Sequence, residues 1–294
     1  MRVAIVGYGG AGRQHEEAIR QVAQVSLAGI LDTDHEILLP EELRLPSWDA
    51  VLSDSTIDTV ALCLPPGGRA DRVVEALRAN KKVLVEKPPA MSVAEFDRIV
   101  AEPGTVAVML QHRFRLPREA LLDWPGGATG VLLVSRPRDA VRHYRGWRGD
   151  SSSALGGIMA HLGVHYLDLA CQVLGEVERV EIADYHECAP GIDLRSSGLI
   201  RFASGATLNF TVTADVSTRA ERLILLADDR RLEIRDGAVE FQRGDETVGA
   251  RELTTSQARA RVYGELSVGP DRSALHRTRP AMVVLDALRE MGAR

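Results

Sequence analysis

Hydrophobic residues in the first third of the chain occur in short unbroken runs, each followed by a stretch with helical spacing. The runs lie at residues 3–6, 27–31, 59–64, 82–85 and 106–110, with a further apolar element near 50–52. Continuously apolar strands that alternate with helices are typical of a parallel sheet covered on both faces. We therefore expect an α/β domain over residues 1–115.

The pattern changes after residue 115, where short alternating segments are joined by turn dipeptides such as Ser204-Gly205 and Asp236-Gly237. Such segments are typical of strands joined by hairpin turns. One strong helix is expected near 156–174 and a last one over 280–291. The pattern predicts a second domain over residues 116–294, of the α+β class with an open, mostly antiparallel sheet.

A glycine loop, Gly7-Tyr8-Gly9-Gly10-Ala11-Gly12, follows the first strand directly. Gly7 permits the tight turn, Gly9 lets the backbone approach a pyrophosphate, and Gly12 lets the helix pack against the sheet. The pyrophosphate would lie at the helix N-terminus, where free N–H groups favour negative charge. This context predicts a Rossmann dinucleotide-binding domain, although FAD and S-adenosylmethionine proteins share part of the pattern.

Asp32 ends the second strand, twenty residues beyond Gly12. A carboxylate at this position can accept hydrogen bonds from the adenosine ribose and would repel a 2′-phosphate. No arginine follows it directly. NAD is therefore favoured over NADP as the cofactor.

The overall composition argues against several other classes of protein. A net charge of -5 and an aromatic content of 4% speak against nucleic-acid binding. No apolar stretch is long enough to span a bilayer, and no secretory signal is visible. Cys63, Cys171 and Cys188 form no C-x-x-C pair, which argues against a disulfide framework or a structural zinc site. We expect a cytoplasmic protein without membrane or nucleic-acid partners.

Three further segments stand out: Glu86-Lys87-Pro88 after the fourth apolar run, residues 155–168 with His161 and His165, and Gln111-His112-Arg113-Phe114. They resemble, in turn, the E-K-P signature, the G-G-G…D-x-G-x-H-x-x-D segment and a segment common at the domain junction of the Gfo/Idh/MocA oxidoreductases. The resemblance covers nearly the whole chain. It implies cofactor contacts from Gly7, Tyr8, Gly9, Gly10, Ala11, Gly12, Asp32, Pro65, Glu86 and Lys87.

The resemblance also implies a catalytic group of Lys87, His165 and His161. In this assignment Lys87 stabilises charge on the substrate oxygen, and His165 moves the proton, a role that suits the imidazole group in general. His161 stands where the family has aspartate or asparagine, so either the proton passes through both histidines or His161 only contacts substrate. The i, i+4 spacing of the two histidines also suits a metal site, but no glutamate follows His161 as in H-E-x-x-H, and we expect no metal.

Other departures lie around the expected substrate site. Arg69 stands where a histidine often follows the Pro-Pro segment, Leu155 replaces the first glycine of the triplet, and the second domain is shorter than usual. Trp147 and Arg148 resemble a segment of members that act on nucleotide-linked sugars; the alternative is that Trp147 is a core residue and Arg148 an ion-pair partner. The expected substrate contacts are His112, Trp147, Arg148, His161 and Asp168.

The combined expectation is an NAD-dependent dehydrogenase that transfers hydride between NAD(H) and a secondary alcohol or ketone of a sugar, cyclitol or sugar-nucleotide-like substrate. The resemblance further implies a homodimer or homotetramer formed through the open sheet. Two alternatives remain open: a non-catalytic NAD- or ligand-sensing regulator on the same fold, and an enzyme that recycles NAD while it cleaves glycosides.

Overall fold

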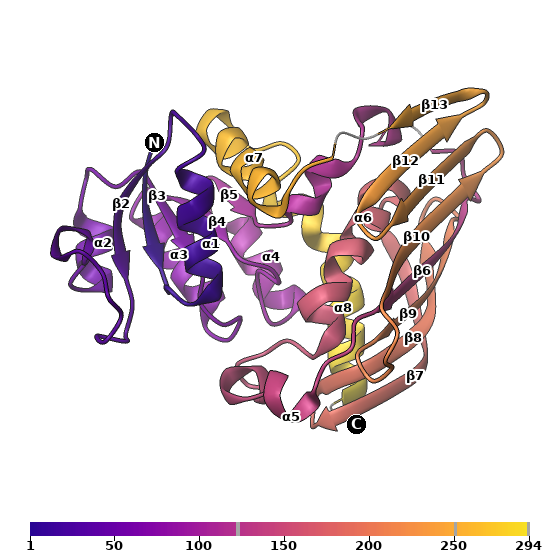
Figure 1. Cartoon of the computed structure of the whole chain (residues 1–294), viewed down its shortest axis with the longest axis horizontal. Coiled ribbons are helices and arrows are strands. Elements are labelled where there is room, and N and C mark those ends of the chain that lie inside the picture. The colour runs from indigo at the N-terminus through magenta and orange to yellow at the C-terminus, as the bar shows by residue number, and fades with distance from the viewer. Residues whose placement is uncertain (122–123, 250–251, 293–294) are drawn as a thin grey trace. The chain divides into compact units, whose positions relative to one another are not determined.

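The computed structural model describes residues 1–121, 124–249 and 252–292, which form two compact units. The first unit comprises Met1–Ala90, Ala94–Phe114 and Leu253–His276, and the second comprises Met91–Val93, Arg115–Glu252 and Arg277–Arg294. Each unit is built on its own sheet, as Figure 1 shows.

The sheet of the first unit is parallel throughout, with the strand order β2-β1-β3-β4-β5. Its strands are β1 (Arg2–Val6), β2 (Ser26–Leu31), β3 (Thr59–Leu62), β4 (Lys82–Val85) and β5 (Val106–Val108). Its helices are α1 (Gly10–Ile19), α2 (Trp48–Ser53), α3 (Arg69–Arg78), α4 (Val93–Ala101) and α7 (Thr255–Val268). The α/β class predicted for this part of the chain is confirmed.

Because all strands of this sheet are parallel, the loops that follow their carboxyl ends lie at the same edge of the sheet. From β1 the chain turns to β2 on one side, and from β3 it proceeds through β4 to β5 on the other. Right-handed crossovers then put α1 and α3 on opposite faces of the sheet. The carboxyl ends of β1 and β3 flank the point where the order reverses, which is where open α/β sheets bind ligands.

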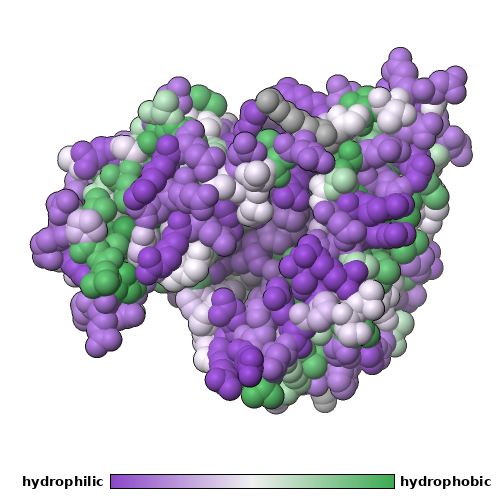
Figure 2. Space-filling view, viewed as in Figure 1, coloured by the Kyte–Doolittle hydropathy of each residue, from purple (hydrophilic) through white to green (hydrophobic). Residues whose placement is uncertain are grey.

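The apolar element near 50–52, whose type the sequence left open, is the helix α2. Ser47 caps α2 by accepting a hydrogen bond from the Ala50 N–H at 3.1 Å, and Val51 faces the interior. Beyond β2, an isolated bridge between Ile30 and Arg44 extends the sheet edge. Figure 2 shows hydrophobic side chains gathered over this β2 edge, in a surface that is otherwise chiefly hydrophilic around α1.

The place of residues 253–276 differs from the predicted one, because the predicted division assigned everything after residue 115 to the second domain. In the structure this segment belongs to the first unit, where α7 packs against α1. Val262, Tyr263 and Leu266 of α7 are buried in the same hydrophobic core as Val3 and Ile5 of β1. The apolar face of α7 thus completes a core that the first 115 residues leave uncovered.

The second unit contains an eight-stranded sheet with the order β13-β12-β11-β10-β6-β9-β8-β7. Neighbouring strands are antiparallel except for β6 and β9, which are parallel, so the mostly antiparallel sheet predicted is confirmed. The strands are β6 (Thr129–Ser135), β7 (Val177–Ala189), β8 (Ile192–Phe202), β9 (Thr207–Thr213), β10 (Ala220–Ala227), β11 (Arg230–Arg235), β12 (Ala238–Arg243) and β13 (Glu246–Gly249).

Helices α6 (Val164–Leu174) and α8 (Arg279–Gly292) cover one face of this sheet, and α5 (Ala140–His143) is a single short turn. Strand β6 shows the resulting alternation: Leu132 and Val134 are buried, whereas Val131 and Leu133 on the other face are exposed. The helix predicted near 156–174 is divided, because a π-helical turn over Met159–Gly163 precedes α6.

Candidate active site

The glycine loop joins β1 to α1 with the geometry that its glycines require. Gly7 has a φ of +90°, and a Cβ on Gly12 would lie 2.3 Å from the carbonyl oxygen of Gly7. By contrast, nothing lies within 4 Å of a Cβ placed on Gly9 or Gly10. Gly9 is the N-cap of α1, so this open space lies at the N-terminus of the helix. This arrangement suits a phosphate group.

Asp32 holds the glycine loop from the end of β2. Its carboxylate accepts hydrogen bonds from the backbone N–H of Tyr8 and, at 2.9 Å, from that of Asp34. The Tyr8 ring lies under the Arg13 guanidinium at 4.7 Å, and its hydroxyl donates to Glu16. Each carboxylate oxygen can accept more than one hydrogen bond, so Asp32 retains capacity for ribose hydroxyls.

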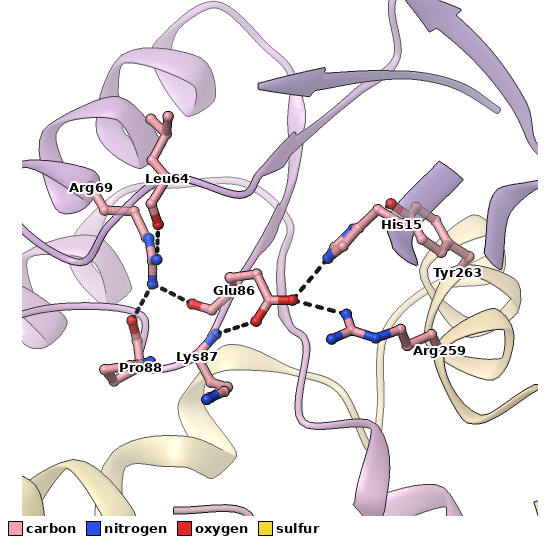
Figure 3. Close-up of polar contacts among 8 residues, drawn as sticks. All are labelled: His15, Leu64, Arg69, Glu86, Lys87, Pro88, Arg259 and Tyr263. Atoms are coloured by element: carbon pink, nitrogen blue, oxygen red, sulfur yellow. Dashed lines mark hydrogen bonds and ion pairs between the residues drawn. The ribbon is translucent and has the colours of Figure 1, made fainter. Parts of the chain in front are cut away.

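Lys87 follows β4 and is half-buried at the same edge of the sheet. The peptide bond between Lys87 and Pro88 is cis. Arg69, only 3% exposed at the start of α3, points into this turn (Figure 3). Its guanidinium donates to the carbonyl oxygens of Glu86, at 2.7 Å, Pro88 and Leu64. Burial lowers the pKa of Arg69 to about 10, with Glu86 opposing the shift, so the guanidinium remains charged at neutral pH.

Glu86, an expected cofactor contact, has its carboxylate turned into the first unit (Figure 3). Its Oε1 atom accepts from Arg259 Nη1 at 2.8 Å and lies 3.1 Å from His15 Nε2. Burial would raise the pKa of Glu86, but Arg259, with His15 and Lys87, holds it well below its usual range. His15 Nδ1 lies 2.7 Å from the Tyr263 hydroxyl. The Glu86 carboxylate is thus committed to α1 and α7.

In the second unit, His161 lies in the π-helical turn and His165 in the first turn of α6. His165 is buried and His161 is half-buried. The start of this helical segment is held by Asp193 of β8, whose carboxylate accepts from the N–H groups of Gly157 at 2.6 Å and Met159 at 3.1 Å. Burial raises the pKa of Asp193, and these two hydrogen bonds counteract the shift.

Gly157 is required by this close approach, because a Cβ there would lie 2.0 Å from the carbonyl oxygen of Asp193. The glycine pair 156–157, which the sequence matched to a family segment, therefore serves to dock the His161 helix onto β8. π-helical turns occur often at functional sites.

Aromatic rings surround His161 within the second unit. The Tyr144 ring stacks on the imidazole with centroids 5.7 Å apart and an interplanar angle of 15°. The rings of Trp147 and His143 meet it edge-on at 6.0 and 5.8 Å. The Arg148 guanidinium lies 4.6 Å from the Trp147 ring centroid. Three expected substrate contacts, His161, Trp147 and Arg148, thus form one cluster.

The remaining predicted residues take more varied positions. Asp168 lies on α6 and is 1% exposed, and its carboxylate accepts a hydrogen bond from Gln172 at 3.3 Å. Pro65 lies in the turn after β3, and His112 lies in a 3-10 turn after β5; both are half-buried. Pro65 and His112 therefore lie at the sheet edge that carries Lys87, and Asp168 lies on the same helix as His165.

Sequence reasoning missed three residues that hold the predicted groups in place. Arg69 was noted only as a departure from a histidine, while Arg259 and Asp193 were not noted at all. Arg259 is 173 residues from its partner Glu86, and Asp193 is 36 residues from Gly157. Neither pairing has a local sequence signal.

Within residues 1–121, 124–249 and 252–292, no three histidine, cysteine or acidic side chains are arranged to hold a metal ion. No helix in the same ranges combines the length and the hydrophobicity needed to cross a membrane.

Comparison with known proteins gives matches in both units. Residues 1–113 match the model of the oxidoreductase family with an NAD-binding Rossmann fold, and residues 128–235 match the GFO/IDH/MocA C-terminal domain. The chain is 24% identical to a myo-inositol 2-dehydrogenase of Thermotoga maritima over 63% of this chain and 58% of that protein. It is 28% identical to an NADP(+)-linked D-xylose 1-dehydrogenase of Haloferax volcanii over 70% of this chain and 67% of that protein.

The fold is also that of a solved levoglucosan dehydrogenase in complex with NADH and levoglucosan. The two structures align with a TM-score of 0.82 and 17% identity, over 100% of this chain and 97% of the other. The alignment with the first curated relative spans about three fifths of that relative's length.

Proposed function

Because the chain belongs to the Gfo/Idh/MocA family of oxidoreductases, we propose that it is an NAD-dependent dehydrogenase or reductase. Its substrate in this proposal is a secondary alcohol or ketone of a sugar, a cyclitol or a sugar nucleotide. The observation that supports the proposal most is the position of Lys87. A lysine lies at the carboxyl edge of a dinucleotide-binding sheet, in a turn whose carbonyl groups are held by a buried guanidinium.

The first unit fits a dinucleotide on the geometry of its own residues. Gly9 and Gly10 leave open space before the N-terminus of α1, and Asp32 lies beside the loop with hydrogen-bonding capacity to spare. Asp32 and the neighbouring Asp34 would repel a 2′-phosphate, which supports NAD over NADP. When it is bound, the nicotinamide supplies the acceptor or donor of hydride.

The protein's own residues would bind the substrate oxygen and move its proton. The Lys87 ammonium would donate a hydrogen bond to this oxygen and stabilise the negative charge that develops on it. The His165 imidazole would take or return the hydroxyl proton, since an imidazole titrates near neutral pH. His161, stacked on Tyr144, would contact the substrate from the aromatic cluster.

A panel of polyols, sugar acids and nucleotide sugars, followed by NADH absorbance, tests the reaction class. Hydride exchange with at least one member supports a dehydrogenase and argues against a non-catalytic sensor. Release of a free aglycone without net NADH would instead indicate glycoside cleavage with recycled NAD.

Substitution of Lys87 by alanine tests the assigned role of this residue. We expect turnover to fall roughly 10²–10³-fold, because the group that stabilises charge on the substrate oxygen is removed, while NAD affinity measured by calorimetry is retained. Lys82→Ala, at the other end of β4, is the matched control and should keep wild-type turnover. Wild-type rates in Lys87→Ala would remove Lys87 from the mechanism.

We further propose that the protein is a homodimer or homotetramer that associates through the outer face of the second unit's sheet. Val131 and Leu133 of β6 and Leu226 of β10 are exposed on strands whose alternate side chains are buried. A shallow hollow of about 570 Å³, lined by β6, β7, β8 and β9, lies on this face. Exposed apolar side chains on a flat sheet are typical of association surfaces.

A cytoplasmic location belongs to the same proposal. The cysteines Cys63, Cys171 and Cys188 are all free thiols, which is the state favoured in a reducing compartment.

A further inference from the structure

Glu86 is held by groups from three parts of the first unit, as Figure 3 shows. Its Oε1 atom contacts Arg259 of α7 at 2.8 Å and His15 of α1 at 3.1 Å, and its Oε2 atom accepts from the Lys87 N–H at 3.2 Å. The Glu86 side chain is buried, and that of Arg259 is 9% exposed. The carboxylate therefore links α7 directly to the backbone of the residue assigned to the substrate oxygen.

The network also determines the protonation of His15. Burial lowers the pKa of this imidazole, and Glu86 opposes the shift. His15 is therefore uncharged at pH 7 and above. The carboxylate can only accept, so the proton is on Nε2 and is donated to Glu86. Nδ1 then accepts from the Tyr263 hydroxyl. His15 contributes hydrogen bonds to the network but no charge.

Two ionisable groups that interact with Glu86 stay neutral at alkaline pH. Burial raises the pKa of the Cys63 thiol and of the Tyr263 hydroxyl, so both are neutral. The Arg69 guanidinium of α3 donates to the backbone carbonyl oxygens of the Lys87 turn. Glu86 and Arg259 form a buried ion pair at the Lys87 backbone, and their opposite charges offset one another. Buried charges of this kind are weakly screened and act strongly on a neighbour.

We propose that Arg259 is a positioning residue for the reaction: through the buried Glu86 carboxylate it holds the backbone at Lys87 and keeps the charge beside the Lys87 ammonium balanced. The inference rests on the function proposed above, because it matters for catalysis only if Lys87 acts on the substrate oxygen. It assigns to α7 a part in the site although α7 lies more than 160 residues beyond Lys87 in the sequence. Glu86 then acts through its neighbours and not as a ligand of the cofactor.

The composition of the chain allows a direct test on the full-length protein. It contains only three lysines, Lys81, Lys82 and Lys87. In protein labelled with [ε-¹³C]lysine, the NMR spectrum has three lysine signals, and Lys87→Arg identifies the one of interest. Lys81, which donates to the carbonyl oxygens of Asp54 and Ile57, and Lys82 serve as internal references.

Opposite charge changes should move the Lys87 titration in opposite directions. Glu86→Gln leaves the Arg259 cation unbalanced and should lower the midpoint of the Lys87 titration by roughly 1 pH unit. Arg259→Met leaves the Glu86 carboxylate unbalanced and should raise it by a similar amount. The double variant removes both charges, folds without a lone buried charge, and should titrate near the wild-type midpoint. The alkaline limb of the plot of kcat against pH should change in the same way in each of the three variants.

A merely structural role would not produce shifts of opposite sign. Glu102→Gln, which breaks an exposed ion pair with Arg78 in the same unit, is the matched control and should leave the Lys87 signal unchanged. Unchanged midpoints in both single variants, or shifts in the same direction, would overturn the proposal. If the NMR shifts occur but Lys87→Ala keeps full turnover, the charge balance stands and the proposed catalytic role of Lys87 fails.

Discussion

Arg69 occupies a position where the family resemblance leads one to expect histidine, and it does what a histidine cannot. An imidazole has two ring nitrogens, whereas a guanidinium carries five N–H donors in a rigid fork. Arg69 uses this fork to satisfy the carbonyl oxygens of Leu64, Glu86 and Pro88, in the turns that follow β3 and β4. At this scale, one side chain satisfies buried carbonyl groups on both sides of the Lys87 turn.

Arg69→Met should therefore destabilise the protein by about 3 kcal/mol, because it leaves several buried carbonyl groups without donors. The free energy of unfolding in urea measures this loss. Arg72→Met, one turn further along the same helix, removes an exposed ion pair with Glu75 and should change stability by less than about 0.5 kcal/mol. Equal effects of the two substitutions would contradict the role given to Arg69.

At the scale of elements, the segment that carries His161 and His165 depends on a strand for its start. The first N–H groups of a helix have no partners within the helix, and a negative charge near them is favourable. Asp193 of β8 supplies that charge from a buried position, in the manner of a capping residue that is remote in sequence. The glycine at position 157 is what lets the strand come close enough.

Asp193→Asn should weaken this attachment, because an amide offers one acceptor oxygen where the carboxylate offers two. We expect a loss of about 1–3 kcal/mol in stability and a fall in kcat, with NAD affinity unchanged because the first unit is untouched. Asp184→Asn is the matched control, because it weakens an exposed ion pair between Asp184 of β7 and Arg195 of β8. Full activity in Asp193→Asn would show that the histidines do not need this anchor.

At the scale of the whole molecule, the outer face of the eight-stranded sheet leads to a prediction about assembly. Wild-type protein should have the mass of a dimer or tetramer in sedimentation equilibrium, whereas the double variant Val131→Asp/Leu133→Asp should be monomeric, since it buries two charges in the proposed contact. Leu38→Asp changes a side chain that is 94% exposed after β2 and should leave the mass unaltered. A monomeric wild-type protein would refute the proposal.

Local pattern was enough to predict the parallel strands and the glycine loop. These features depend on residues close together in sequence, where hydrophobic period and glycine geometry act directly. Strand β7 was not predicted, because its thirteen residues include several charged side chains and show no clean alternation. The apolar element near 50–52, which is the helix α2, was given no type, because a short apolar run is ambiguous between helix and strand.

The sequence by itself thus determined the two fold classes, the dinucleotide loop and the residues that resemble a family's active site. Only the tertiary structure decided what holds them: Arg259 on Glu86, Arg69 on the Lys87 turn, and Asp193 on the His161 helix. Each is a buried polar group that must find a partner when water is removed, and that partner is set by which elements pack together. Spacing along the chain carries no information about such pairs, because packing brings together residues that the chain keeps far apart.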